Sequence, residues 1–579
     1  MADPIITIAQ RLKPTFARIG GISQADADAV VRRSDRADAQ VNGSLALAKQ
    51  LGKTPREIAQ LVLDEADLSS VCSRVEIAGP GFINITFAPE FLAAELARAA
   101  ADPRLGVSSA TKAQTVVIDY SAPNVAKEMH VGHLRSTVIG DAIVRMLEFV
   151  GHKVIRENHI GDWGTPFGML IEHLIDLGET EAANELSVGD LDSFYKQART
   201  KFDAEDSFKE RARARVVLLQ GGDAETLRMW KLLVGESTRY FDRVYRSLDV
   251  LLTADDIMGE SAYNHLLAQV VERLSSAKML ETSDGAEVVF VDGFVNRDNE
   301  PLPLIIRKTD GGYNYATSDL ACVIDRVERL GATVILYIVG APQAQHLEMV
   351  GVVSRKAGWV PVSTQMVHVA FGNVLGNDRK ILKSRSGEVV KLDALLTEAV
   401  DRAKDAVREK NPDWSDAQHN AIAKQVGIGA IKYADLSTDR IKDYVFDWER
   451  MLSFDGNTSP YLQYAHARIC SIFRKAGVDR ASVRGVTPLV EHEAERALVL
   501  RLLQFDTAVW DTLDKYSPHR LCTYLYDLAS EFSAFYEHCP VMRAENDEQR
   551  TSRLALCDFT ARVMSQGLAL LGIETPEQM

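Results

Sequence analysis

The chain has 579 residues, of which 46% are hydrophobic and 25% charged, the balance of a soluble globular protein with several domains. Its net charge of −15 excludes a generally basic surface, so an RNA partner would need a local basic stripe. The six cysteines form no CxxC pair, and neither a stretch of 18 apolar residues nor a secretory leader occurs. We therefore expect a cytoplasmic protein without zinc, disulfides or a membrane span.

Residues 1–113 are predicted to form a small α+β domain. Apolar residues recur at helical spacing over residues 5–19 and 44–66. Two short strands, at residues 71–77 and 82–87, flank the turn Gly79-Pro80-Gly81.

Residues 114–400 are predicted to form an α/β domain with a doubly wound parallel sheet. A β-branched strand at 115–120, a helix at 130–150 and a strand at 154–156 form one βαβ unit. Residues from about 190 to 300 are interpreted as an insertion, helical to about 275. Sheet signals return at 287–291 and 304–308, and a helix at 317–330 precedes strands at 334–339 and 366–371. Residues 401–579 are predicted to be α-helical throughout.

The first chemical motif is His130-Val131-Gly132-His133, at the predicted start of a helix. A helix N-terminus favours phosphate through its free N–H groups and dipole, and two histidines can add donors as charge develops. Gly132 would leave room for a flat adenine against the backbone. The pattern is short, so a pair of helix-capping histidines is the alternative.

The second motif is the basic segment Lys380-Ile381-Leu382-Lys383-Ser384, which follows a predicted strand and a Gly-Asn-Asp turn. Lysines on a mobile loop can close over a triphosphate and neutralise its charge. A solvated basic loop is the commoner origin of such a run.

The sequence around both motifs resembles the class I arginyl-tRNA synthetases. The passages SAPNVAK (121–127) and HVGHLRST (130–137) match their signature, and HVGH and residues 380–384 take the places of the HIGH and KMSKS motifs, which bind ATP on a Rossmann core. The second motif departs from the consensus at Ile381 and Leu382, and Pro166 after GDWGT (161–165) stands where glutamine is expected. Further similarity lies at 310–321, 446–448 and 456–468, so matches extend in order over residues 79–579. The resemblance implies a Rossmann-type class I catalytic core with an inserted helical region, a small N-terminal α+β domain that contacts tRNA, and an all-α anticodon-binding domain.

The resemblance also implies an arginine site. The planar guanidinium group of arginine needs carboxylates in a fixed geometry. By similarity, Asp119 and Asp319 are these acids, Tyr315 contacts the substrate, Asn124 holds its backbone, and Gln343 is a further contact. Without the resemblance, Asp319 would be interpreted as a helix-start acid and Tyr315 as a core residue.

The implied reaction has two steps. Arginine and ATP give arginyl-adenylate and pyrophosphate, and the terminal adenosine of tRNA(Arg) then takes the arginyl group and releases AMP. His130, His133 and Lys383 are the expected catalytic groups, and Gly132, Lys380 and Ser384 complete the ATP site. Mg²⁺ accompanies ATP, no metal is bound by the protein itself, tRNA is needed even for the first step, and the enzyme is expected to be a monomer.

The tRNA contacts implied by the resemblance are Phe82 and Asn84 for the elbow, and Tyr536 and Met579 for the anticodon loop. An aromatic ring beside an amide suits a splayed-out base. Phe82 opens a strand, however, and could instead be a core residue.

Three alternatives remain open. The first is another class I synthetase, such as the cysteinyl or glutamyl type; the cysteinyl type would want zinc ligands, and the acids Asp119 and Asp319 favour a cationic substrate. A nucleotidylyltransferase shares the HxGH pattern but is usually much shorter. A non-catalytic paralogue is disfavoured because both histidines and the lysines are retained.

Overall fold

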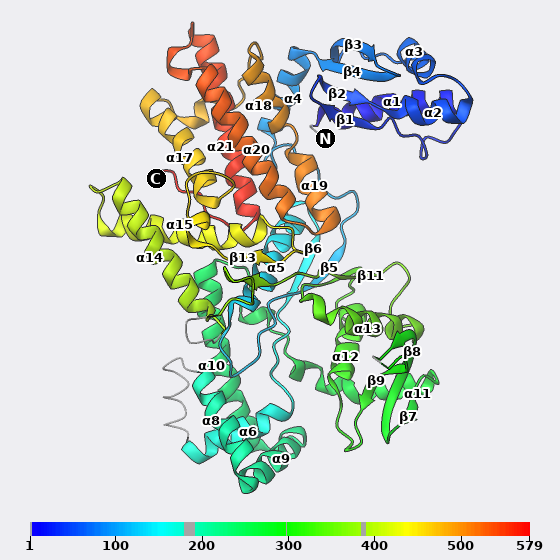
Figure 1. The fold of residues 1–579 in the computed structure, drawn as a ribbon, viewed down its shortest axis with the longest axis vertical. Coiled ribbons are helices and arrows are strands. Elements are labelled where there is room, and N and C mark those ends of the chain that lie inside the picture. Colours follow the sequence, from blue (N-terminus) through cyan, green and yellow to red (C-terminus); the bar gives the residue numbers. More distant parts are fainter. Residues whose placement is uncertain (1–2, 179–190, 297, 384–388) are drawn as a thin grey trace. The chain divides into compact units, whose positions relative to one another are not determined.

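The computed structural model describes residues 3–178, 191–296, 298–383 and 389–579. The chain folds into two compact units: unit 1 combines residues 1–109 with 453–579, and unit 2 comprises residues 110–452 (Figure 1). The predicted division near residue 113 lies close to the first of these breaks. The predicted helical C-terminal domain, from residue 401, begins inside unit 2, because the helices at 392–436 pack against the catalytic core. In the described part of the chain, no helix is long and apolar enough to cross a membrane.

The N-terminal part of unit 1 is a four-stranded antiparallel sheet with helices packed on one face (Figure 1). Its elements are α1 (Pro4–Gly20), β1 (Val31–Ser34), β2 (Ala37–Val41), α2 (Gly43–Leu51), α3 (Pro55–Glu65), β3 (Cys72–Ala78), β4 (Phe82–Phe87) and α4 (Pro89–Ala101). The strand order is β1-β2-β4-β3. β3 and β4 confirm the predicted hairpin, whereas β1 and β2 were not predicted, because the sequence VRRSDRADAQV has too few apolar residues to signal strands.

The C-terminal part of unit 1 is a bundle of five α-helices, which confirms the predicted helical pattern. They are α17 (Ser459–Ala476), α18 (Glu493–Leu502), α19 (Phe505–Lys515), α20 (His519–His538) and α21 (Asp547–Leu570). Ion pairing and hydrogen bonds join them to the N-terminal part. Arg496 of α18 pairs with Asp38 of β2, and Asp506 of α19 accepts hydrogen bonds from the backbone and side chain of Ser108.

The centre of unit 2 is a four-stranded parallel sheet in the order β11-β10-β5-β6. The strands are β5 (Thr115–Asp119), β6 (Lys153–Glu157), β10 (Val334–Tyr337) and β11 (Gln365–His368). In this register Asp119 is level with Glu157 on one side and with Tyr337 on the other, so the carboxyl ends of three strands share one edge. Ligands of doubly wound sheets bind outside that edge.

Helix α5 (Val131–Phe149) connects β5 to β6 and is buried along most of its length. Its close approach to the strand depends on Gly140, because a Cβ there would lie 2.5 Å from the side chain of Tyr120. The sheet and α5 therefore form one tightly packed βαβ unit, as predicted.

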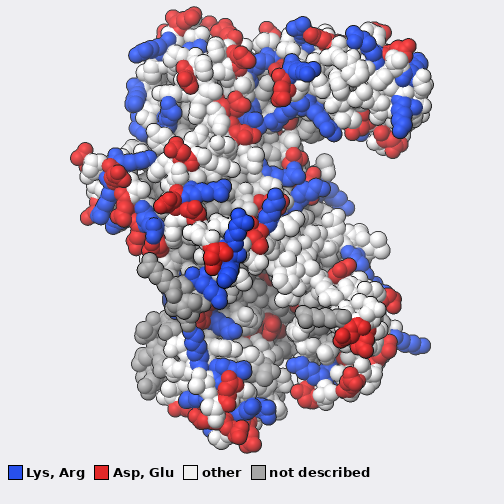
Figure 2. Space-filling view, viewed as in Figure 1, with Lys and Arg blue, Asp and Glu red and all other residues white. Residues whose placement is uncertain are grey.

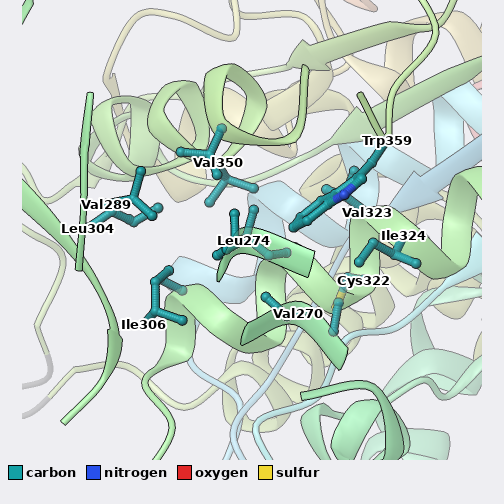
Figure 3. Close-up of a cluster of buried hydrophobic side chains, with 14 of the residues drawn as sticks. Val270, Leu274, Val289, Leu304, Ile306, Cys322, Val323, Ile324, Val350 and Trp359 are labelled. Carbon is teal, nitrogen blue, oxygen red and sulfur yellow. The ribbon is translucent and has the colours of Figure 1, made fainter. Parts of the chain in front are cut away.

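The strand signals near 290 and 305 do not belong to the parallel sheet. β7 (Glu281–Ser283), β8 (Ala286–Val295) and β9 (Pro301–Arg307) form a separate three-stranded antiparallel sheet. Their apolar face packs on α11 (Leu267–Ser276), α12 (Tyr315–Glu328) and α13 (Ala344–Lys356). Figure 3 shows this buried cluster, including Val270 and Leu274 of α11, Val289 of β8 and Cys322 of α12. The cluster fixes α12, whose first two turns contain two of the predicted site residues, Tyr315 and Asp319.

The remaining helices of unit 2 flank this core. α8 (Leu191–Ala204), α9 (Asp206–Gln220) and α10 (Ala224–Leu248) lie in the helical part of the predicted insertion, and α6 (Thr165–Leu177) precedes it. α14 (Leu392–Lys410) and α15 (Asp416–Leu436) contact each other and α5. Two short strands, β12 (Val374–Leu375) and β13 (Tyr444–Val445), pair in parallel, and α16 (Trp448–Met451) follows.

Candidate active site

The HVGH motif forms the N-terminus of α5, as predicted. His130 is the N-cap: its Nδ1 accepts a hydrogen bond from the backbone N–H of Gly132 (3.0 Å), and Nδ1 of His133 accepts one from the N–H of His130 (3.1 Å). Burial lowers the pKa of both imidazoles, that of His133 to about 3. Both rings are therefore neutral at pH 7, with Nδ1 used on the backbone and the Nε2–H left as the donor for a ligand.

The packing around Gly132 explains why this position is a glycine, which the sequence alone did not reveal. A Cβ at this position would lie 2.7 Å from Cε1 of the His130 ring. The two imidazole rings are also only 4.0 Å apart, centre to centre. The glycine is thus required by the packing of His130 on the helix end, in addition to any contact with a ligand.

The lysine segment begins as a hairpin that follows β12. The N–H of Gly376 donates to the carbonyl of Lys380 (2.8 Å), and Leu375 bridges to Ile381. Lys380 and Lys383 are exposed. Ser384 lies outside the described residues.

The chain that leaves the lysine segment runs antiparallel to the start of α5. The N–H of Val131 donates to the carbonyl of Val390 (3.0 Å), the N–H of Leu392 donates to the carbonyl of Met129 (2.9 Å), and Lys391 forms an ion pair with Glu128. Backbone hydrogen bonds therefore join the HVGH helix end to Val390 and Leu392, and Lys383 bridges to Val389, so the two motifs, about 250 residues apart in sequence, are connected through residues 389–392.

Asp319 lies one helical turn after Tyr315 at the start of α12. Its Oδ2 is 2.5 Å from Nε2 of His346 in α13, and the ring of His346 lies 4.8 Å from that of Tyr315. Tyr315 is 61% exposed, so it is available to a ligand and is not the core residue of the alternative interpretation. Gln343 lies three residues before His346 and is also exposed.

Asp119 has a partner within the protein. Its Oδ2 accepts a hydrogen bond from Arg326 of α12 (2.7 Å), and the same guanidinium donates to Glu157 (2.6 Å). Arg326 is almost fully buried, and its charge is balanced by these two acids. Asp119 thus fixes α12 against the sheet through Oδ2, while its Oδ1 is buried without a hydrogen-bond partner among the described residues.

Asn124 is an exposed residue in the otherwise mostly buried segment between β5 and α5. This segment pairs with Gly161 after β6: Val125 donates to the carbonyl of Gly161 (3.0 Å), and Gly161 donates to that of Pro123 (3.1 Å). A Cβ on Gly161 would lie 2.3 Å from Oδ1 of Asn124. The glycine of the GDWG passage therefore gives the Asn124 amide the space it occupies.

Comparison with known proteins bears on what this edge of the sheet does. Residues 96–448 match the family described as "tRNA synthetases class I (R), catalytic domain", residues 6–87 the "Arginyl tRNA synthetase N terminal domain", and residues 462–579 the "DALR anticodon binding domain". The chain is 53% identical over all 579 residues, and over the full length of both proteins, to an arginine–tRNA ligase of Thermobifida fusca. It is 50% identical over 570 residues to that of Erwinia tasmaniensis, covering 98% of each chain.

The chain belongs to the class I arginyl-tRNA synthetase family.

Solved structures agree with this assignment. The arginyl-tRNA synthetase of Plasmodium falciparum superposes with a TM-score of 0.85 at 28% identity and covers 99% of each chain. That of Thermus thermophilus superposes with a TM-score of 0.82 at 25% identity over 99% of this chain and all of the other. The predicted fold class, a Rossmann-type class I core with a small N-terminal domain and a helical C-terminal domain, is confirmed.

Glu260 and His159 are site residues that sequence reasoning missed. Burial raises the pKa of Glu260 to about 7, the negative charges of Asp162 and Asp319 add to the rise, and His159 opposes it. The thiol of Cys322 lies 4.0 Å from Nδ1 of His159. Ligand atoms of His159, Asp319 and Cys322 all lie within 4.8 Å of one another, the closest approach to a metal-binding set in the described part of the chain. Glu260 falls in the predicted insertion, far in sequence from Asp319, and no local signal marked it.

The residues expected to contact tRNA lie in unit 1. Phe82 and Asn84 point to the face of β4 opposite the buried Ile83, Ile85 and Phe87, so Phe82 is not a core residue. Nε2 of Gln40 donates to Oδ1 of Asn84 (2.8 Å). In the helical bundle, the guanidinium of Arg468 lies 4.2 Å from the ring centre of Tyr536, and Met579 is half-buried at the end of the described chain. On the face drawn in Figure 2, acidic and basic side chains are interspersed, with no single basic field.

Proposed function

We propose that the protein is an arginine–tRNA ligase, which forms arginyl-adenylate from arginine and ATP and transfers the arginyl group to the terminal adenosine of tRNA(Arg). The observation that supports this most directly is the backbone pairing of Met129 and Val131 with Val390 and Leu392. It brings the HVGH helix end and the lysine segment together beside the carboxyl edge of the sheet. Asp319 and Glu260 supply the negative charge for a cationic amino acid at the same edge.

In the first step a carboxylate oxygen of arginine attacks the α-phosphorus of ATP, and the bond to the bridging oxygen breaks to release pyrophosphate. The protein needs no nucleophile, so catalysis consists of positioning and charge stabilisation. The neutral His130 and His133 donate Nε2–H groups to phosphate oxygens, and Lys380 and Lys383 neutralise the triphosphate. Gly132 lies against the nucleotide, Ser384 completes this site, and Mg²⁺ enters with ATP as part of the substrate.

Substrate arginine is held by its two ends. Asp319 accepts hydrogen bonds from the guanidinium, with His346 orienting its carboxylate, and Glu260 is the second acid. Tyr315 packs against the substrate. The α-amino and α-carboxylate groups of the amino acid are held by the polar side chains at the sheet edge, Asn124 and Gln343. Asp119 offers its unpartnered Oδ1 to substrate arginine, and its Oδ2 bond to Arg326 fixes the helix that presents Asp319.

In the second step the ribose hydroxyl of the tRNA attacks the carbonyl carbon of the adenylate, and AMP leaves. Phe82 and Asn84 contact the tRNA elbow, and Tyr536 and Met579 contact the anticodon loop. All six cysteines are free thiols, which fits a monomer that works in the reducing cytoplasm.

The test is pyrophosphate exchange with arginine, ATP and tRNA, in the wild type and in Asp319→Asn. Removing the charge that receives the guanidinium should raise the KM for arginine about 10- to 100-fold, because hydrogen bonds to charged groups contribute about 1.5–3 kcal/mol. The KM for ATP should change little. The matched control is Asp325→Asn on the same helix, whose carboxylate is bonded to Arg329. Exchange supported by lysine, glutamate or cysteine in place of arginine would reject the proposal. An equal rise in both KM values would remove the role given to Asp319.

A further inference from the structure

Three different metal-ligand types converge beside the proposed arginine site. The imidazole of His159, the thiol of Cys322 and the carboxylate of Asp319 present ligand atoms within 4.8 Å of one another. His159 follows β6, while Asp319 and Cys322 are neighbours on the inward face of α12. The hydrophobic cluster drawn in Figure 3 holds Cys322, and with it the helix that carries Asp319, in place.

The spacing is close to that of a coordination shell. Nitrogen and sulfur ligands on a tetrahedral zinc ion are about 3.5 Å apart, given bond lengths of about 2.0 and 2.3 Å. The Cys322 Sγ to His159 Nδ1 distance is 4.0 Å, so a shift of about 0.5 Å, small for side chains, would complete the pair. The same nitrogen lies 3.0 Å from the carbonyl oxygen of Met258, so a metal ion would displace the proton that Nδ1 shares with that carbonyl.

The charges around the cluster favour a cation. Glu260 interacts electrostatically with Asp319 and Asp162, and the cation near Cys322, Arg326, is itself balanced by Asp119 and Glu157. The other neighbour of Asp319 is the imidazole of His346, itself a metal-ligand type. A divalent ion would relieve the repulsion among these carboxylates, and His159, Cys322 and Asp319 would leave its fourth position open to water or to Glu260.

We propose that His159, Cys322 and Asp319 form a binding site for a thiophilic divalent cation of the zinc and cadmium class, and that the bound ion and substrate arginine exclude each other. The ion acts as an inhibitor and not as a resident cofactor, since the proposed reaction needs no protein-bound metal. The cysteine loses its proton to solvent when the metal–sulfur bond forms. The exclusion rests on the proposed role of Asp319 in holding arginine; the metal site itself does not.

A second cysteine–histidine pair in the chain serves as a matched control. In α17 the thiol of Cys470 lies 3.9 Å from Nδ1 of His466, the same contact as between Cys322 and His159. Its third neighbour is a cation, because Arg480 donates to the Cys470 sulfur (3.7 Å). A positive charge where the first cluster has a carboxylate disfavours a divalent ion.

The experiment titrates Cd²⁺ into the full-length protein under a non-thiol reductant and follows the ultraviolet thiolate-to-cadmium charge-transfer band. We expect about one equivalent to bind in the wild type and in Cys470→Ser, no band in Cys322→Ser, and binding at least tenfold weaker in His159→Gln. Thermal unfolding of each variant checks that it is folded. No band in the wild type, or a band unchanged in Cys322→Ser, would overturn the metal site.

Arginine distinguishes the two proposals. Saturating arginine should suppress the band, and Zn²⁺ should inhibit pyrophosphate exchange competitively with arginine and non-competitively with ATP. If the band appears and requires Cys322 but arginine leaves it unchanged, the metal site stands and the assignment of Asp319 to arginine fails. If arginine supports exchange but no band forms, the proposed function stands and the metal inference fails.

Discussion

The buried ion pair between Arg135 of α5 and Asp435 of α15 offers a quantitative test of how the two halves of the ATP site are held. Nε of Arg135 lies 3.1 Å from Oδ2 of Asp435, and the two side chains are 1% and 0% exposed. Nη1 of Arg135 also donates to the carbonyl of Lys442 (3.0 Å), and its guanidinium lies 5.3 Å from the ring centre of Tyr444. Lys442 and Tyr444 lead into β13, which pairs with the strand that begins the lysine segment. Arg135 therefore connects the HVGH helix to the base of that segment.

Replacing Arg135 with alanine would leave the Asp435 carboxylate buried without its partner. Loss of one member of a buried pair costs about 3–5 kcal/mol, whereas replacing both with apolar residues of similar volume is often neutral. We expect Arg135→Ala to lower the unfolding free energy of unit 2 by about 3–5 kcal/mol, and the double variant Arg135→Met with Asp435→Leu to recover most of it. The control, Arg199→Ala, removes an exposed pair with Asp203 and should cost about 0.5 kcal/mol.

The assay is urea unfolding followed by tryptophan fluorescence, which reports mainly on unit 2 because Trp510 alone of the six tryptophans lies in unit 1. The kinetic readout is pyrophosphate exchange, in which the KM for ATP should rise more than that for arginine. A loss below about 1 kcal/mol in Arg135→Ala, or a double variant as unstable as the single one, would refute the reasoning about the pair. Equal changes in the two KM values would refute its link to the ATP site.

Three further outcomes follow from the site. Because the pKa of Glu260 is about 7, its side chain is mostly neutral at pH 6 and mostly ionised at pH 8, and the KM for arginine should fall several-fold over that range. In Glu260→Gln the KM for arginine should not change with pH. A pH dependence as steep as that of the wild type would assign the titration to another group. Gly161→Ala should displace the Asn124 amide and raise the KM for arginine, with circular dichroism and the KM for ATP nearly unchanged; a wild-type KM would show that the amide does not touch the substrate. Lys383→Met should lower kcat about 10²- to 10³-fold through lost charge stabilisation, and Lys380→Met less; the reverse order would exchange their roles.

Local patterns predicted the elements that were strongly periodic. The strand at 115–119, the helix that starts at His130 and the C-terminal helices all have uninterrupted apolar spacing. The strands at 31–41 were missed because their residues are mostly polar or small. The strands near 290 and 305 were recognised as strands. A local strand signal does not say which sheet a strand joins, because that depends on pairing between segments distant in sequence.

Prediction of the site from the sequence has the same limit, because residue types can be recognised locally but contacts between distant segments cannot. HVGH and the lysine segment were found by their residue types, and the fold then joined them through backbone bonds at Val131 and Val390. Asp119 was visible as an acid at a strand end, but the burial of Arg326 against it depends on how α12 packs. Glu260 had no sequence signal, because its role follows from a distant loop folding back onto α12.

The discontinuous composition of unit 1 has a consequence for biosynthesis. Residues 1–109 are made first, yet Asp38 and Ser108 find their partners, Arg496 and Asp506, on helices that are among the last to be made. At about 5–20 residues per second, the roughly 340 intervening residues take about 17–70 s to synthesise. Unit 2, continuous in sequence, is complete before the helices of unit 1 emerge from the ribosome. The chain is therefore expected to acquire its catalytic core first, while α4, Asp38 and Ser108 wait for their partners, and a chain arrested before residue 453 would leave these contacts unmade and accessible to chaperones and proteases.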